Sequence, residues 1–417
     1  MRTTMATENN NKNLNVPNLR FPEFSGEWEK TTLGNIGETF NGLTGKSGAD
    51  FGQGSPYITY KSIFDNSRID LSRVELVTIT DQERQKGTQN KVQYGDIFFT
   101  TSSETPEEVG MTSVLLDDTE DCYLNSFCFG YRLYSKEHIL PEYMRFYLRT
   151  QGVRKKLFVL AQGSTRFNIS KGEVMNVSVA IPEIKEQEKI AKFLSLLEER
   201  IDTQIKIIEK LESLIRGIVE THYSQSECVN QVRISELGEP FSTMNMSKED
   251  LSEEGNECIL YGELFTTYGC VIKEVKSRTH ISTNKATVSQ SNDLLFPAST
   301  TVDAMSLIAP SAICKEGVIL GGDLFGVHVN KNYNNEYLSY LINYIYKSKL
   351  ARYAQGSTII HLHYSDIKNA TLVLPTIEEQ NYLAHIMRVV EEKINIEKDM
   401  LSKLYSQKAY LLSNLFI

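Results

Sequence analysis

The five residues AQGST at Ala161–Thr165 occur again at Ala354–Thr358, 193 residues further along the chain. The same offset relates the residues that follow without a gap, as in the pairs Pro182 and Pro375, Gln187 and Gln380, Ala191 and Ala384, and Ile201 and Ile394. Upstream the likeness is fainter and its offset drifts, as between PYITYKSIF (56–64) and ECILYGELF (257–265). A period near 190 residues is much longer than a solenoid repeat. Each copy is therefore predicted to be a whole domain with an attached element.

A long helix is predicted after each copy of AQGST, because apolar residues there alternate spacings of four and three, as in a coiled-coil seam. The first seam comprises Ile190, Leu194, Leu197, Ile201, Gln204, Ile208, Leu211, Ile215 and Ile218, and the second Leu383, Met387, Val390, Ile394, Glu397, Leu401, Leu404, Lys408 and Leu411. Both have a polar residue at the same position, Gln204 and Glu397, which can fix the register of a helix pair. We expect the two helices to pair. The alternative is two amphipathic helices, each packed on its own domain.

The part of each copy before its long helix has the pattern of a mixed α/β domain. Short β-branched and aromatic runs, such as 57–63 and 97–101, are separated by Gly, Asn, Asp and Ser, which is typical of strands and turns. One helix is predicted from Pro141, suited to the first helical position, to Gly163, a candidate C′ glycine, with its counterpart at about 336–356. The predicted fold is α+β: two tandem mixed α/β domains, each followed by a long helix, with the helices pairing as an antiparallel coiled coil about a pseudo-twofold axis.

The predicted boundaries follow from these patterns. Residues 1–25 are an N-terminal segment expected to be partly disordered, 26–181 the first domain, 182–223 the first long helix, 224–374 the second domain and 375–417 the second long helix. Between Pro182 and Ile218 the first helix would extend roughly 54 Å, at ~1.5 Å per residue. This length exceeds one turn of B-DNA, about 34 to 36 Å.

Composition excludes several classes of protein. With 417 residues, 41% hydrophobic and 10% aromatic, the chain is predicted to be globular with more than one core. No apolar run follows the arginine near the N-terminus, and nowhere do about 18 apolar residues follow one another, so neither a secretory signal nor a membrane span is expected. The cysteines form no CxxC pair and are expected to be reduced, mostly buried thiols in a cytoplasmic protein: Cys122, Cys128, Cys228, Cys258, Cys270 and Cys314.

Signatures of catalysis and of cofactor binding are weak. NGLTGKS (41–47) ends like a phosphate-binding loop, but Phe40 stands where that motif needs its first glycine, so a glycine-rich turn is the better interpretation. No GxSxG, HExxH or kinase motif set occurs, nor the Asn-Pro-Pro-aromatic tetrapeptide of DNA amino-methyltransferases. His361 and His363, followed by Asp366, could ligate a metal, but polar contacts or solvent exposure are favoured. We expect no cofactor, no metal and no catalytic residue.

Positive charge gathers where the repeat is strongest, although the net charge is −9. Residues 141–172 contain seven basic side chains against Glu142 alone, namely Arg145, Arg149, Arg154, Lys155, Lys156, Arg166 and Lys171. Residues 336–371 contain four against two acidic ones, with His361 and His363 in addition. Aromatic residues interleave with both sets. A basic helix face is often merely solvated, but duplicated basic patches beside Ser/Thr-rich loops favour contacts with phosphates and base edges.

Three features together resemble the DNA specificity subunit of Type I restriction-modification systems. They are VPNLRFPEFSGEWEKTTLG (16–34), the two QGST loops, and the two P-x-I-x-E-Q openings of the long helices at Pro182 and Pro375. The resemblance covers essentially the whole chain. It implies two target recognition domains, each binding one half of a bipartite site in double-stranded DNA. It also implies helices that act as a spacer and as a docking surface for two methyltransferase subunits, with restriction and translocase subunits joining through them. Adenine methylation and cleavage would then reside in those partners.

Candidate DNA contacts follow from the basic patches, the loops and the resemblance. In the first domain they are Gln162, Ser164, Thr165, Arg166, Asn168 and Lys171, with Arg154 and Lys155 on the preceding helix; in the second they are Gln355, Ser357, Thr358, His361, His363 and Tyr364. The runs 100–103 and 299–301 are weaker candidates that can equally be strand-end caps. Arg166 is the best candidate for a base contact, because arginine pairs bidentately with guanine. A coiled-coil scaffold without nucleic acid and an enzyme with an unrecognised site remain the alternatives.

Overall fold

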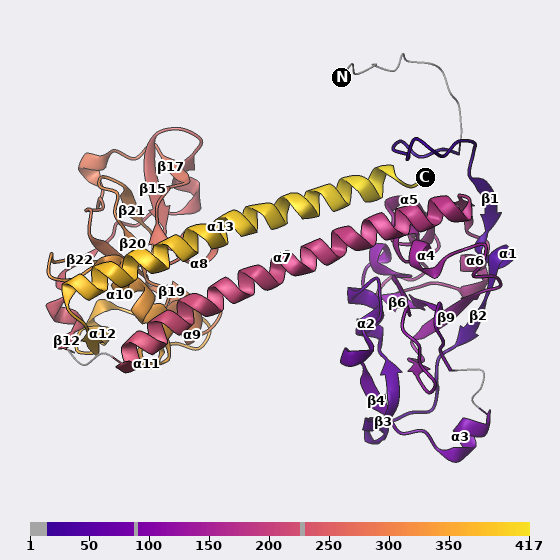
Figure 1. The fold of residues 1–417 in the computed structure, drawn as a ribbon. Helices are drawn as coiled ribbons and strands as arrows, with labels where there is room; N and C mark the ends of the chain where they lie inside the picture. Colours follow the sequence, from indigo (N-terminus) through magenta and orange to yellow (C-terminus); the bar gives the residue numbers. More distant parts are fainter. Residues whose placement is uncertain (1–14, 87–90, 226–229) are drawn as a thin grey trace, which may run out of the picture. The chain divides into compact units, whose positions relative to one another are not determined.

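The computed structural model describes residues 15–86, 91–225 and 230–417, which form two compact units. Unit 1 comprises Met1–Thr203 and Leu401–Ile417, and unit 2 comprises Gln204–Met400 (Figure 1). Both long helices, α7 (Ile184–Gln225) and α13 (Ile377–Asn414), pass from one unit into the other. The start of α7 and the end of α13 belong to unit 1, and their other halves to unit 2.

Unit 1 is built from short strands and helices around aromatic and aliphatic side chains. Its strands are β1 (Glu29–Thr32), β2 (Gly37–Asn41), β3 (Phe51–Ile58), β4 (Glu75–Val77), β5 (Ile97–Thr100), β6 (Ser102–Ser103), β7 (Thr112–Val114), β8 (Tyr123–Leu124), β9 (Cys128–Leu133), β10 (Phe167–Asn168) and β11 (Ser178–Ile181). Its short helices are α1 (Leu33–Ile36), α2 (Tyr60–Asp65), α3 (Asp81–Lys86), α4 (Pro141–Tyr147), α5 (Gln151–Phe158) and α6 (Lys171–Met175). The sheets have the orders β2-β9-β5-β7 and β4-β3-β8, with the pairs β1-β11 and β10-β6.

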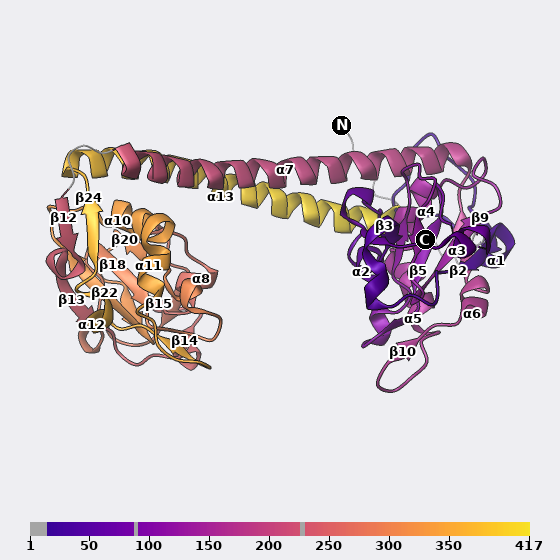
Figure 2. The same cartoon turned by 90° about the horizontal axis from the view of Figure 1, so that it is seen from below.

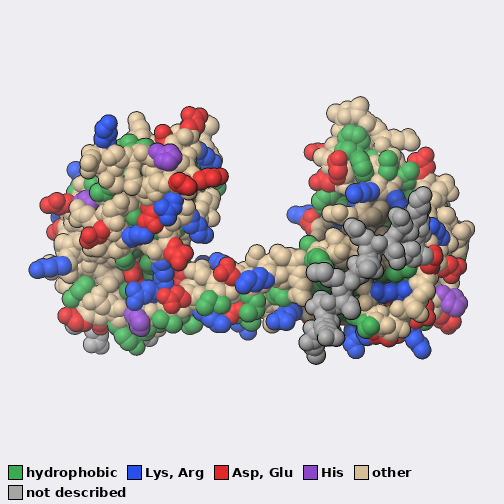
Figure 3. All heavy atoms as spheres, turned by 90° about the horizontal axis from the view of Figure 1, so that it is seen from above, with side chains coloured by type: hydrophobic (Ala, Val, Ile, Leu, Met, Phe, Trp, Pro, Cys, Tyr) green, Lys and Arg blue, Asp and Glu red, His purple; other side chains and the backbone are tan. Residues whose placement is uncertain are grey.

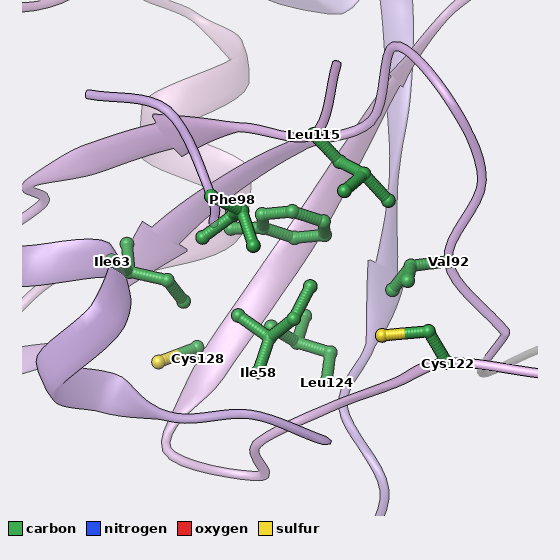
Figure 4. Packing of buried hydrophobic residues seen from close by; sticks show 9 residues of the cluster. Ile58, Ile63, Val92, Phe98, Leu115, Cys122, Leu124 and Cys128 are labelled. Carbon is green, nitrogen blue, oxygen red and sulfur yellow. The ribbon is translucent and has the colours of Figure 1, made fainter. Parts of the chain in front are cut away.

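The core between these sheets is apolar and fully covered. Phe98 lies at its centre, with Ile58, Leu124 and the thiols of Cys122 and Cys128 around it (Figure 4). Burial of an aliphatic or aromatic side chain of this size stabilises the folded state by roughly 1.5–3 kcal/mol. Burial also raises the pKa of both thiols to about 12, so they stay protonated and act as packing groups.

Unit 2 repeats this architecture, with one more strand in each of its two larger sheets. Its strands are β12 (Asn230–Arg233), β13 (Gly238–Ser242), β14 (Leu251–Ser252), β15 (Asn256–Leu260), β16 (Val271–Ile272), β17 (Ser277–Thr279), β18 (Asp293–Pro297), β19 (Ser299–Thr300), β20 (Ser311–Ile313), β21 (Ile319–Gly321), β22 (Leu324–Val329), β23 (Ile360–His361) and β24 (Thr371–Leu374). Its short helices are α8 (Glu263–Thr266), α9 (Ala304–Leu307), α10 (Asn335–Leu341), α11 (Lys347–Ala351) and α12 (Tyr364–Ile367). The sheets are β13-β22-β18-β20-β16 and β14-β17-β15-β21, with the pairs β12-β24 and β19-β23 (Figure 2).

The repeat extends to single contacts in the cores. A Cβ added to Gly130 on β9 would lie 2.0 Å from the ring of Phe40, and one added to Gly326 on β22 would lie 2.3 Å from the ring of Phe241. In both domains a glycine therefore leaves room for a phenylalanine on the neighbouring strand. Each ring also lies beside a side chain that contacts a buried carboxylate: the side chain is Arg132 and the carboxylate Asp96 in unit 1, and they are His328 and Asp293 in unit 2.

The P-x-I-x-E-Q openings have a structural explanation. The buried side chain of Gln187 accepts a hydrogen bond from Leu140 N–H and donates to the carbonyls of His138 and Pro182, all at 2.9 Å. Gln380 accepts from Asn334 N–H at 3.0 Å and donates to Pro375 O at 2.9 Å. Each glutamine thus joins the start of a long helix to the segment that leads into α4 or α10. The helices begin two residues after Pro182 and Pro375.

The seams of the two long helices meet within each unit. In unit 1, Lys408 Nζ lies 2.6 Å from Glu198 Oε1, and in unit 2, Lys398 Nζ lies 2.9 Å from Glu212 Oε1. Most of the predicted pairing residues are buried: Ile190, Leu194, Leu197, Ile201, Ile208, Leu383, Met387, Ile394 and Leu404, while Leu211, Val390 and Leu401 are half-buried. Because each unit holds the start of one helix and the end of the other, the two run antiparallel.

The polar seam residues Gln204 and Glu397 contact each other. Gln204 Nε2 donates to the carboxylate of Glu397 and, at 3.2 Å, to its carbonyl oxygen. These two residues are equivalent in the repeat. An antiparallel pair in which equivalent residues touch has its local twofold axis at that point. The two polar positions therefore satisfy one another and set the register of the helix pair.

Two predictions about these helices are wrong: that residues 141–163 form a single helix, and that Gly163 and Gly356 end helices. Residues 141–163 form two helices, α4 with Pro141 in its first turn and α5, separated at Leu148–Thr150. The counterpart stays helical but passes through a π-helical segment, Ile342–Tyr346, between α10 and α11. Gly163 does not end a helix, because α5 stops at Phe158, and Gly356 likewise follows α11 by several residues.

The N-terminal segment folds against unit 1 wherever it is described. Arg20 donates two hydrogen bonds, at 2.8 and 2.7 Å, to the buried carboxylate of Glu186, and Leu19 N–H donates to Asn414 O at 2.9 Å. The last residues of the chain also return here, since the ring of Phe416 lies 5.6 Å from that of Tyr143. Residues 1–14, part of the segment predicted to be partly disordered, lie outside the described residues.

The cysteines are free thiols wherever the structure describes them. Cys122, Cys128 and Cys258 are buried, Cys270 is half-buried, and Cys314 is exposed. Cys228 lies outside the described residues. Over the same parts of the chain, no helix is both long and apolar enough to cross a membrane.

Candidate nucleic-acid interface

The AQGST copy in unit 1 forms a short hairpin loop. Gln162 N–H donates to Asn168 O at 2.9 Å and Asn168 N–H donates to Gln162 O at 2.8 Å, which closes the loop. Strand β10 then pairs with β6, Phe167 opposite Ser103 and Asn168 opposite Ser102. We call residues 102–105 together with 162–168 the first edge.

Unit 2 repeats the geometry. Gln355 N–H donates to His361 O at 2.9 Å and His361 N–H donates to Gln355 O at 2.7 Å. Strand β23 pairs with β19, with Ser299 opposite His361 and Thr300 opposite Ile360. Residues 299–302 together with 355–361 are the second edge.

The glycine of AQGST is required by this loop. Gly163 and Gly356 have φ values of +136° and +123°, which side chains other than glycine's rarely adopt. A Cβ would also lie 2.1 Å from Arg166 O in the first loop and 2.0 Å from Ile359 O in the second. The repeated sequence therefore encodes the shape of the loop.

The side chains on both sides of the glycine are presented to solvent. Gln162, Ser164, Thr165, Arg166 and Asn168 are exposed, and so are their equivalents Gln355, Ser357, Thr358, Ile359 and His361. Asn168 donates to Arg166 O at 3.3 Å, which helps to hold the loop. Within the described residues the Arg166 guanidinium makes no hydrogen bond or ion pair, so it is available to a ligand.

Three arginines of the predicted basic patch have structural roles instead. Arg149 donates to four carbonyl oxygens, including Thr112 O at 2.6 Å, and Arg145 pairs with Glu198. Arg154, a predicted DNA contact, donates to the carbonyls of Glu107, Val109 and Gly110, each at 2.6 Å. Desolvation lowers the pKa of Arg145 and Arg149 to about 10, yet both remain protonated near pH 7.

The other two lysines of the prediction differ in their surroundings. Lys155 is exposed on α5 and has no polar partner among the described side chains and backbone. Lys171 begins α6, is half-buried, and donates to Asn41 Oδ1. Only Lys155 is therefore free to contact a phosphate without losing an internal bond.

The second edge continues into two histidines and a tyrosine. The rings of His361 and His363 are stacked, with centroids 6.2 Å apart, and both are exposed. Tyr364 starts α12 and is half-buried. Asp366 accepts a hydrogen bond from His363 N–H at 2.8 Å and so caps α12. Among the residues that the structure covers, no group of His, Cys, Asp and Glu is arranged to hold a metal ion.

The Ser/Thr runs lie directly under the loops, where they support the backbone. Thr101 Oγ1 donates to Phe127 O at 2.6 Å, and Ser103 Oγ donates to Glu108 Oε2 at 2.9 Å. In the second edge, Thr300 Oγ1 accepts from Val302 N–H at 3.2 Å. Ser102, Ser103, Ser299 and Thr300 are buried, so the outward positions are the ones that follow them.

The phosphate-loop-like stretch is likewise structural. Lys46 Nζ donates to Thr78 O and to Glu83 Oε2, both at 2.7 Å, and its side chain is buried. A charged hollow of about 1220 Å³ in unit 1 is also accounted for, because Arg145 and Lys408 on its wall both pair with Glu198.

Comparison with known proteins gives a consistent result. The family model described as the Type I restriction modification DNA specificity domain matches twice, over residues 25–213 and 227–405. The chain belongs to this family. Each match spans one domain and most of its long helix, so two specificity domains follow one another in a Type I restriction-modification specificity subunit.

Individual relatives agree along nearly the whole length. This chain is 23% identical over 418 residues to a putative type I restriction enzyme MjaX specificity subunit of Methanocaldococcus jannaschii, and the match covers 94% of each chain. The crystal structure of a Type-I restriction-modification system S subunit from M. genitalium matches with a TM-score of 0.61 at 14% identity, covering 96% of this chain and 99% of that one. A structure from work on complex assembly and conformational transition of the type I R-M system matches at 0.53, with 16% identity and coverage of 93% and 97%. These two structures share the fold.

The pairing of strands identifies exposed residues of the specificity domains that the sequence offset did not. Ser102 and Ser299 are equivalent because each lies opposite the second residue of its hairpin pair, Asn168 or His361. Glu104 and Thr105 therefore correspond to Thr301 and Val302, an offset of 197 residues and not 193. All four are exposed.

Charge on the specificity domains is mixed at larger scale. Lys and Arg side chains are interspersed with Asp and Glu on the drawn face of each unit (Figure 3). On this face neither unit presents a broad basic surface.

Proposed function

We propose that this chain is the non-catalytic subunit that selects where a Type I restriction-modification complex methylates adenine and cleaves DNA. The first domain would bind one half of a bipartite target and the second domain the other. The observation that carries the proposal is the pair of edges, which have the same backbone geometry and different exposed side chains. A shared frame with different contact residues is what two different half-sites require.

The chemistry of the edges suits double-stranded DNA. Hydroxyls and amides, as on Ser164, Thr165 and Gln162, can bond phosphates or base edges, while arginine can bond both O6 and N7 of guanine. Residues identical in the two copies cannot distinguish two half-sites, so we assign them to positioning on the backbone. Discrimination then begins at Arg166 and Ile359. His363 and Tyr364 extend the second contact surface, and Lys155 adds a phosphate contact to the first.

The partners would bind the long helices. In unit 2 the exposed residues Tyr382, Val389 and Ile396 follow one another at seven-residue intervals on α13, with exposed fractions of 67%, 51% and 57%. Ile207 and Leu214 form a similar row on α7. Apolar rows outside the buried seam suit docking of further helices. We assign them to methyltransferase subunits, through which the restriction and translocase subunits would join in the cytoplasm.

Docking can be tested by replacing Val389 and Ile396 with glutamate. Co-purification with the cognate methyltransferase subunit should fall, while Asn395→Glu, at an exposed polar position between them, should leave it unchanged. Equal recovery from all variants would contradict the assignment of this surface.

The proposed function itself is tested by sequencing methylated adenines in the host genome with and without this chain. One bipartite motif should disappear with the chain and return with it. Binding to that motif should weaken steeply with salt, because phosphate contacts release counterions. A non-DNA scaffold would show neither result, and DNA methylation or cleavage by the purified chain alone would instead favour an enzyme with its own site.

A further inference from the structure

The two edges differ in the polarity of their outermost residues. In the first edge these positions are Glu104, Thr105 and Arg166, all polar. In the second edge, Thr301 is polar, whereas Val302 and Ile359 are apolar with exposed fractions of 71% and 50%. A single exposed apolar residue is ordinary, but here two of the three positions are apolar at the same structural place.

Val302 and Ile359 lie on one surface. Both line a hollow of about 800 Å³ in unit 2, together with Thr301 and His361. Met305, 43% exposed, lies on α9, the helix that packs against β19 and β23. The two side chains can therefore contact the same feature of a ligand.

The backbone beneath these side chains is held in place. Val302 N–H donates to Thr300 Oγ1 at 3.2 Å. Ile359 lies in the loop that the two hydrogen bonds between Gln355 and His361 close, next to the positive-φ glycine Gly356. A backbone that is already ordered loses little conformational freedom on binding, which favours selective contact.

In the major groove one group matches this surface. Guanine, adenine and cytosine present hydrogen-bond donors and acceptors there, while thymine also presents its C5-methyl group. Apolar side chains placed against an acceptor or an amino group would leave that group without water and without a partner. Contact with the methyl group instead buries apolar surface on both sides.

We propose that the second domain recognises thymine through contact of Val302 and Ile359 with the C5-methyl group. This inference rests on the proposed function, because it assumes that the second edge lies in the major groove of one half-site. It makes the two domains chemically different readers: the first depends on a guanidinium, and the second depends on an apolar contact flanked by Thr301 and His361.

The test uses deoxyuridine, which pairs like thymine and lacks only the methyl group. The full chain, in complex with its methyltransferase subunits, is titrated with duplexes in which each thymine of the half-site bound by the second domain is replaced singly. At one or two positions the affinity should fall by about fourfold, the value expected for one buried methyl group. Replacing thymines in the other half-site serves as the DNA control.

Protein variants connect the effect to the two residues. Val302→Ala and Ile359→Ala should bind the thymine duplex more weakly and should lose the difference between thymine and deoxyuridine at the sensitive position. Leu76→Ala, at an exposed apolar residue of β4 in unit 1, should keep the full difference. All three residues are exposed, so we expect all three variants to fold.

Two results would overturn the inference and can be told apart. If every deoxyuridine duplex binds within twofold of the thymine duplex, or if both alanine variants keep the discrimination, thymine recognition by this edge is wrong and the proposed function stands. If a duplex with scrambled half-sites binds as well as the target, the proposed function fails and this inference fails with it.

Discussion

Arg166 and Ile359 occupy the same place in two loops of the same shape, so this exchange of side chain is one of the chemical differences between the two domains. Arg166→Ala should relax selection at one base of one half-site and weaken binding by about 1–3 kcal/mol, as expected for loss of a bidentate contact. Sequencing of methylated adenines gives the change in motif, and titration with target duplexes gives the affinity.

Lys155→Ala is the matched comparison, because Lys155 is exposed on α5 outside the edge. A phosphate contact carries no sequence information, so this variant should weaken all duplexes alike and leave the motif unchanged. An unchanged motif and occupancy with Arg166→Ala would remove Arg166 from base recognition.

Lys46 stabilises unit 1 through Glu83, and this contribution should depend on pH. Hydrogen bonds from Lys46 and from Thr80 lower the pKa of Glu83 from an ordinary value of 4.5 to about 2. A carboxyl group whose pKa is lower in the folded state stabilises that state above its unfolded pKa and loses the contribution as pH falls. Unfolding of wild type and Lys46→Met should therefore differ most above pH 4.5, and the difference should shrink towards pH 2. If the difference in unfolding free energy between wild type and Lys46→Met stayed constant across this range, the stabilising role of the Lys46–Glu83 pair would be contradicted. Loss of site selection by Lys46→Met at neutral pH would also contradict a purely structural role for Lys46.

At the scale of single elements, the hairpin loop depends on its glycine. Gly163→Ala should weaken target binding, because the new Cβ cannot stand 2.1 Å from Arg166 O and the positive φ becomes strained. Gly217→Ala, inside α7 where an added Cβ would meet nothing within 4 Å, should instead stabilise the chain by about 0.5–1 kcal/mol. Thermal unfolding and duplex titration of both variants separate the two effects. Undiminished target binding by Gly163→Ala would mean that loop shape is unimportant.

The long helices could be predicted from sequence because their signal repeats over many turns. Heptad spacing and the offset of 193 placed their starts within two residues, and most of the residues assigned to their seams are buried. The pairing of Gln204 with Glu397 was not predicted, since a polar seam residue indicates a fixed register without indicating its partner.

The loops were located correctly and their conformation was not. Gly163 after a helical pattern resembles a C′ glycine, but its conformation is set by hydrogen bonds to Asn168 and by strand β6, about sixty residues earlier in the chain. The surroundings of Arg154 could not be predicted for the same reason. In the sequence it has the pattern of a solvent-exposed basic residue on a helix, but in the fold its guanidinium donates to the carbonyls of Glu107, Val109 and Gly110. Val302 became a candidate only through strand register.

For the whole molecule, the paired helices should fix the gap between the two half-sites. A seven-residue insertion after Leu197 alone breaks the seam and should abolish activity, whereas insertions after both Leu197 and Leu404 lengthen both helices by about 10 Å. This corresponds to roughly three base pairs, at about 3.4 Å each. The methylated motif should then show a longer gap or vanish, because the added base pairs also rotate one half-site about the DNA axis. Retention of the original gap by the double insertion would contradict a spacer role.

The return of the chain end to unit 1 has a consequence for biosynthesis. Phe416 packs against Tyr143 and Tyr147, and Asn414 O accepts the N–H of Leu19, so the first unit needs the last residues to be complete. At about 5–20 residues per second, a ribosome needs roughly 10–40 s to add the two hundred or so residues after Thr203. Unit 2 is continuous in sequence and can fold during that interval. The rings of Tyr143 and Tyr147 in unit 1 are not yet covered by Phe416 at that stage. The domain translated first is therefore finished last, and a nascent chain that stops early leaves these two rings open to chaperones and proteases.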